Sequence, residues 1–181
     1  MSHRVFVILI FMLAGLPGPA RADSQWVLET STLTYHVSHP LHDSEGVSRA
    51  ARGKGLCQAG ECEFLIAVPV KSFDSGDSNR DLHMLQATKG AEFPMVTVRT
   101  RLPETAIAAS PIRADVDVEF AGHTAHYAQV EFQRVTQGAE VHITGSIPAK
   151  LSDFKIDPPS LLTFPVKNDM PVKVDMTWKP Q

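Results

Sequence analysis

The sequence has little cysteine, no excess of basic residues and, beyond its first 22 residues, no long apolar run. Its 17 lysines and arginines are outnumbered by 20 aspartates and glutamates. A balance of this kind provides neither the positive surface that nucleic acids require nor a polybasic segment for anionic lipid head groups. We therefore expect no nucleic-acid partner. Because no later stretch reaches about 20 apolar residues, we also expect no stable membrane insertion.

The one long apolar run lies at the amino terminus. A positive charge precedes it, and an A-x-A motif that ends at Ala22 follows it. This order is typical of a secretory signal peptide. We predict that residues 1–22 are removed by cleavage after Ala22 and that residues 23–181 form one domain, periplasmic or secreted. The residue after the predicted cut is Asp23 rather than cysteine, so no lipid anchor is expected.

The only two cysteines, Cys57 and Cys62, enclose four residues in the segment CQAGEC. In an oxidising compartment, the simplest role for such a pair is a disulfide that closes the tip of a hairpin. The spacing matches neither the C-x-x-C redox motif nor the usual zinc-site spacings. We predict a structural disulfide, with a redox or metal-binding pair as the alternative.

Alternation of apolar and polar residues with a period of two dominates the rest of the chain. In residues 112–120, IRADVDVEF, the apolar side chains fall on one face and the charged ones on the other, which is typical of a strand with one buried face. Similar runs follow one another between short segments rich in Gly and Asp, which indicates an antiparallel all-β architecture. The other faces expected to be buried are Leu33, Tyr35 and Val37; Phe64, Ile66 and Val68; Ala128, Val130 and Phe132; Val141, Ile143 and Ile147; and Val172, Val174, Met176 and Trp178.

A polar insert at residues 74–90 interrupts this pattern. Ser78 followed by Asp81 is an acceptable start for a helix, because serine accepts a free backbone N–H and an acid favours the positive end of the helix dipole. Leu82 and Leu85 are spaced to face the sheet. We therefore predict a short helix that packs over one end of the strands.

Several ordered blocks of the sequence resemble the YceI-like family of exported proteins. The resemblance spans nearly all of residues 25–178. It departs from the family pattern at Ser75-Gly76-Asp77, where the family has Thr-Gly-Asn, and at Phe93-Pro94, where it has Tyr-Pro. The matching blocks are LTYHVSHPLHDSEGVSRAARGKG (33–55), VPVKSFDSGDSNRDLHMLQATKGAEFPMVTV (68–98), VDVEFAGHTAHYAQVEFQ (116–133), KLSDFKI (150–156) and DMPVKVDMTW (169–178).

The resemblance implies an antiparallel, eight-stranded, lipocalin-like barrel with a short helical insert, which carries a polyisoprenoid or similar amphiphilic lipid in its lumen for transport, storage or a stress response. Eight-stranded barrels have room for one small ligand. An apolar lumen shields a lipid chain at about 0.8 kcal/mol per buried CH2. The candidate ligand-binding residues are Tyr35, Phe64, Ile66, Val96, Val98, Val116, Val118 and Phe120, with Arg80 of the helix beside the ligand.

Two other interpretations stay open. Histidines recur every third residue at His36, His39 and His42, and a metal-dependent or hydrolytic enzyme built on such residues is the alternative function. On a strand, a spacing of three places His36 and His39 on opposite faces. Neither an H-E-x-x-H nor a G-x-S-x-G motif is present, so we expect no catalytic residue, metal ligand or cofactor. The second interpretation is that the apolar faces form a packed core with no ligand.

Overall fold

The structure, a computed structural model, describes residues 23–161 and 164–181. The predicted signal peptide and its cleavage site at Ala22 lie outside these residues. No helix in the described part of the chain combines the length and apolarity needed to cross a membrane.

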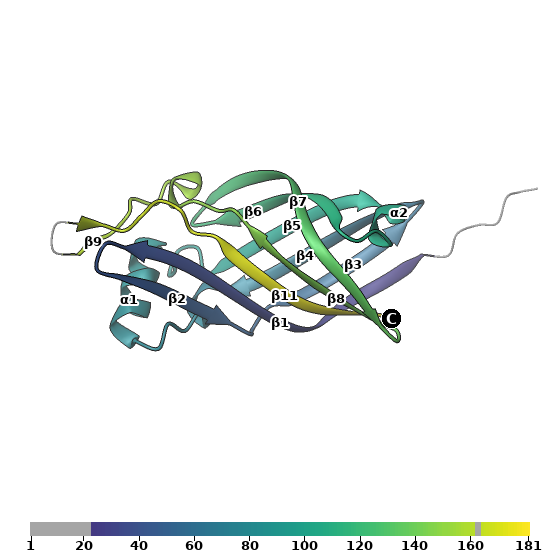
Figure 1. The fold of residues 1–181 in the computed structure, drawn as a ribbon, viewed down its shortest axis with the longest axis horizontal. Coiled ribbons are helices and arrows are strands. Elements are labelled where there is room, and N and C mark those ends of the chain that lie inside the picture. The colour runs from purple at the N-terminus through teal and green to yellow at the C-terminus, as the bar shows by residue number, and fades with distance from the viewer. Residues whose placement is uncertain (1–22, 162–163) are drawn as a thin grey trace, which may run out of the picture.

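Eight antiparallel strands form a closed barrel (Figure 1). The strands follow one another around the ring in nearly the order of the sequence, and the last strand pairs back with the first. This confirms the predicted all-β, eight-stranded, lipocalin-like architecture. The strands of the ring are β1 (Ser24–His39), β3 (Arg52–Gln58), β4 (Glu61–Pro69), β5 (Met95–Pro103), β6 (Ile112–Phe120), β7 (His123–Gln137), β8 (Glu140–Ile147) and β11 (Val172–Pro180).

The alternation in the sequence is the physical cause of this closure. Along β6, from Ile112 to Phe120, every second residue is buried and the residues between them are exposed. Side chains of a strand point to opposite faces of the sheet in turn, so each strand buries one row and solvates the other. Closing the sheet into a barrel gathers all the buried rows into one lumen and leaves no unpaired edge in the ring.

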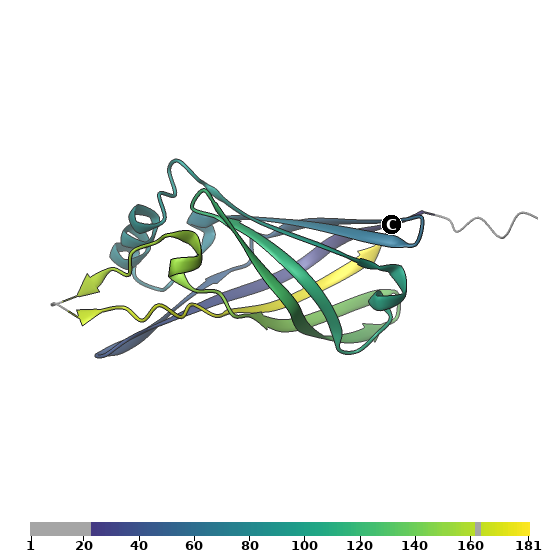
Figure 2. The same cartoon turned by 90° about the horizontal axis from the view of Figure 1, so that it is seen from above.

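Strand β1 is 16 residues long and pairs with two different strands along the same edge. Its residues 24–27 pair with β3, whereas residues 33–39 pair with β2 (His42–Ser48). The β1–β2 hairpin consequently extends beyond the ring at one end of the barrel (Figure 2). The same end carries α1 (Ser78–Ala87), the 3-10 helices η1 (Val70–Ser72) and η2 (Leu151–Phe154), and the small hairpin of β9 (Ser160–Leu161) and β10 (Phe164–Pro165). The short helix α2 (Glu104–Ile107) lies at the opposite end, near the carboxyl terminus.

The predicted helix is present as α1, but two details of the prediction are wrong. The N-cap is Asp77 rather than Ser78, because the Asp77 carboxylate accepts hydrogen bonds from the backbone N–H groups of Asn79 and Arg80. Leu85 packs against the core as expected, whereas Leu82 is exposed to solvent. The face of α1 that turns to the barrel is therefore rotated relative to the predicted one.

A bulge in β7 corrects the predicted face of that strand. Ala114 pairs with Val130, but Val116 pairs with Tyr127, so one extra residue of β7 is accommodated between these pairs. Gln129 takes a left-handed conformation (φ 52°), and both its backbone and its side-chain N–H groups donate to Asp115 Oδ1. Ala128 is exposed as a result, and the predicted inward row of Ala128 with Val130 and Phe132 begins only at Val130.

The predicted disulfide is present. Cys57 and Cys62 are paired across the β3–β4 hairpin, with their Cα atoms 4.0 Å apart, and they are bonded through their sulfur atoms. Both residues are buried. The bond closes the tip of this hairpin, as the spacing predicted.

Candidate ligand-binding cavity

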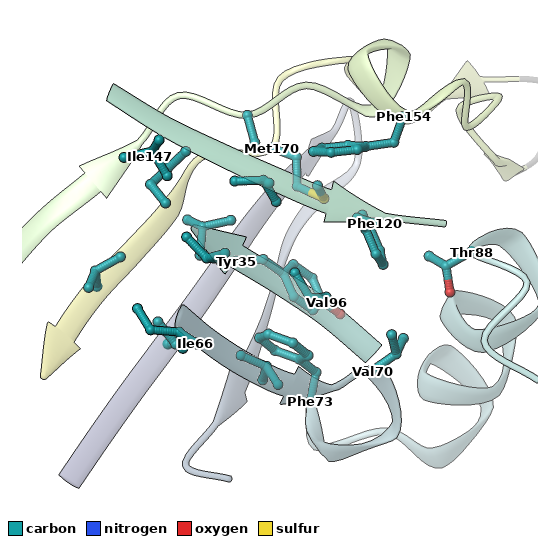
Figure 3. A pocket seen from close by; sticks show the side chains of 18 of the residues that line it. Tyr35, Ile66, Val70, Phe73, Thr88, Val96, Phe120, Ile147, Phe154 and Met170 are labelled. Carbon is teal, nitrogen blue, oxygen red and sulfur yellow. The ribbon is translucent and has the colours of Figure 1, made fainter. Parts of the chain in front are cut away.

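The barrel encloses a cavity of about 590 Å³. This volume lies within the range of about 300–1,000 Å³ that is typical of small-molecule sites. Side chains from strands on several sides of the barrel point into the same space, and Thr88, which caps the carboxyl end of α1, lies at one end of it (Figure 3). The lining is almost entirely apolar, so the cavity suits a hydrocarbon rather than a polar metabolite.

All nine residues predicted to bind a ligand line this cavity. They are Tyr35, Phe64, Ile66, Arg80, Val96, Val98, Val116, Val118 and Phe120. Val116 is only 2% exposed and lies at the middle of β6, between the inward-facing Ala114 and Val118. The rows predicted on β8 and β11 also face the cavity. Whether these residues contact a ligand stays a prediction.

Glycines opposite aromatic residues keep the cavity open. Tyr35 pairs with Gly46, Phe64 with Gly55 and Phe132 with Gly145 across neighbouring strands. A Cβ atom at any of these glycines would overlap the ring of its partner. Each ring therefore lies against the wall over its glycine, the arrangement known as aromatic rescue in designed sheets. The aromatic surface lines the cavity without filling it.

The end of the cavity near α2 is closed by apolar residues. Leu102, Ile112 and Ala114 form a small buried cluster, against which Ile107 of α2 packs. Close by in the barrel, the rings of Phe64 and Trp178 meet edge to face, with their centroids 5.2 Å apart. Among the residues that the structure describes, no charged side chain lines the cavity at this end.

The opposite end is polar. The charged and polar side chains of the lining gather at α1 and the β1–β2 hairpin, with Thr100 as the exception further inside. They are His39, Ser44, Asp77, Asn79, Arg80, His83 and Thr88. The cavity thus has an apolar interior and one polar mouth, which is the shape that an amphiphile with one head group requires.

Arg80 connects α1 to the β1–β2 hairpin at this mouth. Its guanidinium group donates to Ser44 Oγ at 3.2 Å and lies 3.9 Å from the Asp77 carboxylate. Burial raises the pKa of the nearby Tyr35 phenol, the charge of Asp81 raises it further, and that of Arg80 opposes them. Because its pKa is raised, the Tyr35 hydroxyl group stays neutral at physiological pH. Arg80 provides a positive charge in the lining of the mouth.

His39 joins two loops at the same end. Its Nδ1 atom accepts a hydrogen bond from the backbone N–H of Leu41 at 3.2 Å, so its proton is on Nε2, which donates to the carbonyl oxygen of Phe164 at 3.1 Å. The imidazole ring is buried and links the tip of the β1–β2 hairpin to β10. As predicted, His36 has the opposite orientation and contacts Glu45 on the outer face.

The far side of the mouth is held by η2. Phe154 of η2 is buried and meets Phe120 edge to face at 5.3 Å (Figure 3). The hydroxyl group of Tyr127 donates to Asp153 at 2.8 Å, and burial together with this bond raises the pKa of Tyr127. This contact fixes η2 to the barrel wall.

The histidines are dispersed over the molecule. His126 pairs with Asp117 and His142 with Asp175 on the outer wall. Within residues 23–161 and 164–181, no three or more His, Cys, Asp or Glu side chains are grouped so that they could hold a metal ion.

Several lining residues were not predicted. Trp26, Phe73, Met84 and Met170 come from a strand end, loops and α1, where no alternating pattern marks an inward face. His39 could have been recognised, because it continues the row of Leu33, Tyr35 and Val37.

Solved structures share this fold. BcnA from Burkholderia cenocepacia is 15% identical, with a TM-score of 0.69 over 81% of this chain and 95% of that chain. A polyisoprenoid-binding domain from Saccharophagus degradans, implicated in plant cell wall breakdown, is 16% identical, with a TM-score of 0.64 over 86% and 98%. The YceI protein of Campylobacter jejuni is 10% identical, with a TM-score of 0.51 over 98% and 97%. No protein-family model and no curated protein matches the sequence. The YceI-like resemblance predicted from the sequence therefore holds for the fold.

Proposed function

We propose that this protein is an exported carrier that holds a polyisoprenoid or a similar amphiphilic lipid in its barrel. The observation that supports this most directly is the cavity of about 590 Å³, which is apolar along its length and polar at one mouth. One of the proteins with the same fold is a polyisoprenoid-binding domain. In this proposal the chain acts in transport, storage or a stress response, and it is not an enzyme.

The arrangement of the lining favours one orientation of the ligand. Nine-residue strands such as β6 rise about 3.4 Å per residue and tilt by roughly 40° in a barrel, which gives a lumen of about 23 Å. One leaflet of a bilayer is about 15 Å of hydrocarbon, so a chain of that length fits inside. The apolar tail would lie toward α2, and the head group would meet Arg80, Asn79 and His83 at the mouth.

Lipid extraction from native protein tests the proposal. The full chain is expressed in an exporting bacterium, purified without detergent and extracted with organic solvent for mass spectrometry. We expect about one amphiphile per protein. Mass spectrometry of the intact protein from the same preparation gives the mass of the mature chain, and cleavage after Ala22 is expected. Empty extracts, together with no binding of added polyprenyl lipids, would show that the barrel interior is only a core.

A further inference from the structure

Large apolar side chains are exposed around the mouth of the barrel. Leu41, Leu82 and Phe164 come from the β1–β2 turn, α1 and β10, and their exposed fractions lie between 51 and 62%. All three elements lie at the same end of the molecule (Figures 1 and 2). Apolar residues that are exposed together, next to an opening, mark surfaces of interaction.

Leu41 and Phe164 are held beside each other by a single buried side chain. The His39 ring accepts from the backbone N–H of Leu41 and donates to the carbonyl oxygen of Phe164. The backbone N–H of Lys167 donates to Ser38 O at 2.8 Å and joins the same two segments a second time. Two turns far apart in the sequence are therefore fixed together, and the ring that joins them also lines the cavity.

The charge of this end shows which kind of partner it fits. The charges that line the mouth are of opposite sign, because Arg80 lies 3.9 Å from Asp77, and the described residues 37–41, 158–161 and 164–166 include no Asp, Glu, Lys or Arg. The chain as a whole has more acidic than basic residues. An anionic bilayer would gain nothing from such a surface. A neutral, zwitterionic bilayer accepts apolar side chains at its interface without any attraction of opposite charges.

We propose that Leu41, Leu82 and Phe164 form a membrane-contact rim, through which the open mouth of the barrel is applied to a zwitterionic bilayer. This inference rests on the proposed function, because a lipid that passes between a bilayer and the lumen must stay out of water on the way. With the rim in the bilayer interface, the polar mouth lies at the level of the lipid head groups, and a lipid tail passes from the apolar phase of the membrane to the apolar lining of the cavity without entering bulk water.

Vesicle flotation tests the rim. The mature chain is mixed with phosphatidylcholine vesicles, and the triple variant Leu41→Ser/Leu82→Ser/Phe164→Ser is compared with a matched control, Leu56→Ser/Leu65→Ser/Val135→Ser. The control residues have exposed fractions of 44 to 52% and lie away from the mouth. We expect the wild type and the control to float and the rim variant to lose at least about tenfold in affinity. Added phosphatidylglycerol should not be required, and high salt should not release the protein.

A second measurement separates the rim from the lumen. Binding of a fluorescent fatty acid, added below its micellar concentration, should be equal in all three proteins, because the probe reaches the lumen without a membrane. Equal flotation of the rim variant and the wild type, no flotation of the wild type, or flotation that needs anionic lipid would each overturn the membrane-contact rim. Rim-dependent flotation without binding of any lipid in the lumen would leave the rim in place and refute the carrier function.

Discussion

Val116 is the residue at which the carrier proposal is most sharply tested. It lies at the middle of β6, faces the cavity and is 2% exposed. We expect Val116→Trp to lower affinity for a polyprenyl lipid at least about tenfold, because the indole would occupy the space of the ligand. The fold should survive, since the ring can enter existing space rather than displace packed atoms. Fluorescence titration with a polyprenyl probe measures the change.

The matched control is Glu119→Trp on the same strand. Glu119 is exposed on the outer face of β6, so the same bulky side chain is added where no ligand lies. Its affinity should equal that of the wild type. An equal loss of binding in both variants would show that tryptophan disturbs the strand rather than the lumen.

His126 makes one part of the stability depend on pH. Its hydrogen bond to Asp117 at 2.7 Å is the main cause that raises its pKa above the ordinary value of 6.5. A histidine whose pKa is raised by folding stabilises the native state fully below pH 6.5, and this contribution disappears as the pH rises through the raised pKa. The effect is small because the pair is exposed.

Urea unfolding of the wild type and of His126→Gln measures this contribution. The difference between the two midpoints should be largest below pH 6.5 and should vanish at alkaline pH. Titrating groups other than Asp117 and Asp115, which interact with His126, are common to both proteins and cancel. A difference that grew with pH would contradict the assigned ion pair.

At the scale of the strand, the inner width of the barrel depends on glycine–aromatic pairs. A Cβ atom at Gly55 would overlap the ring of Phe64, so we expect Gly55→Val to push that ring into the lumen. Ligand affinity should fall, and stability should fall by about 1–3 kcal/mol, as in other overpacked cores. Lipid titration and urea unfolding measure the two effects.

Two further variants make this prediction specific. Lys54→Val introduces the same side chain one residue earlier, on the outer face, and should leave affinity unchanged. Gly55→Val/Phe64→Leu removes the displaced ring and should recover most of the lost affinity. If the double variant bound no better than Gly55→Val, the position of the Phe64 ring would not determine the width of the lumen.

Alternation along the strands made their inward faces predictable, because a period of two has only one physical explanation in a half-buried strand. The same rule failed at Ala128, where the Gln129 bulge adds one residue and reverses the phase of β7. On helix α1 a different rule, the three-residue spacing of Leu82 and Leu85, failed at Leu82, which lies on the solvent side. Such local reversals depend on partners distant in sequence, such as Asp115 for the bulge.

The polar mouth could be predicted only in part. Arg80 was identified through the family resemblance, whereas the hydrogen bond between Arg80 and Ser44 joins residues 36 positions apart in the sequence. The contacts of His39 with Phe164 span 125 positions. Contacts of this range follow from the closure of the barrel, and no local pattern in the sequence reports them.

For the whole molecule, the cavity and the stability are linked. A cavity of about 590 Å³ lacks the packing contacts that a filled core provides. A lipid that binds only the folded barrel supplies those contacts and stabilises it by mass action, by about 2.7 kcal/mol at a free concentration 100 times its Kd. Protein purified with its lipid should therefore unfold at a higher temperature than protein stripped of lipid, by roughly 5–10 °C for a domain of this size.

Differential scanning calorimetry of the native, stripped and reloaded protein measures this shift, and Val116→Trp provides the control. Because its ring occupies the lumen and weakens binding, the variant should gain clearly less than the wild type on exposure to the same concentration of lipid. The disulfide between Cys57 and Cys62 stays intact throughout, so its chain-entropy contribution of about 2 kcal/mol is common to every sample and cannot produce the difference. A stripped wild-type protein that unfolds at the same temperature as the native one, and gains nothing on reloading, would mean that the barrel is stable empty and has no lipid to carry.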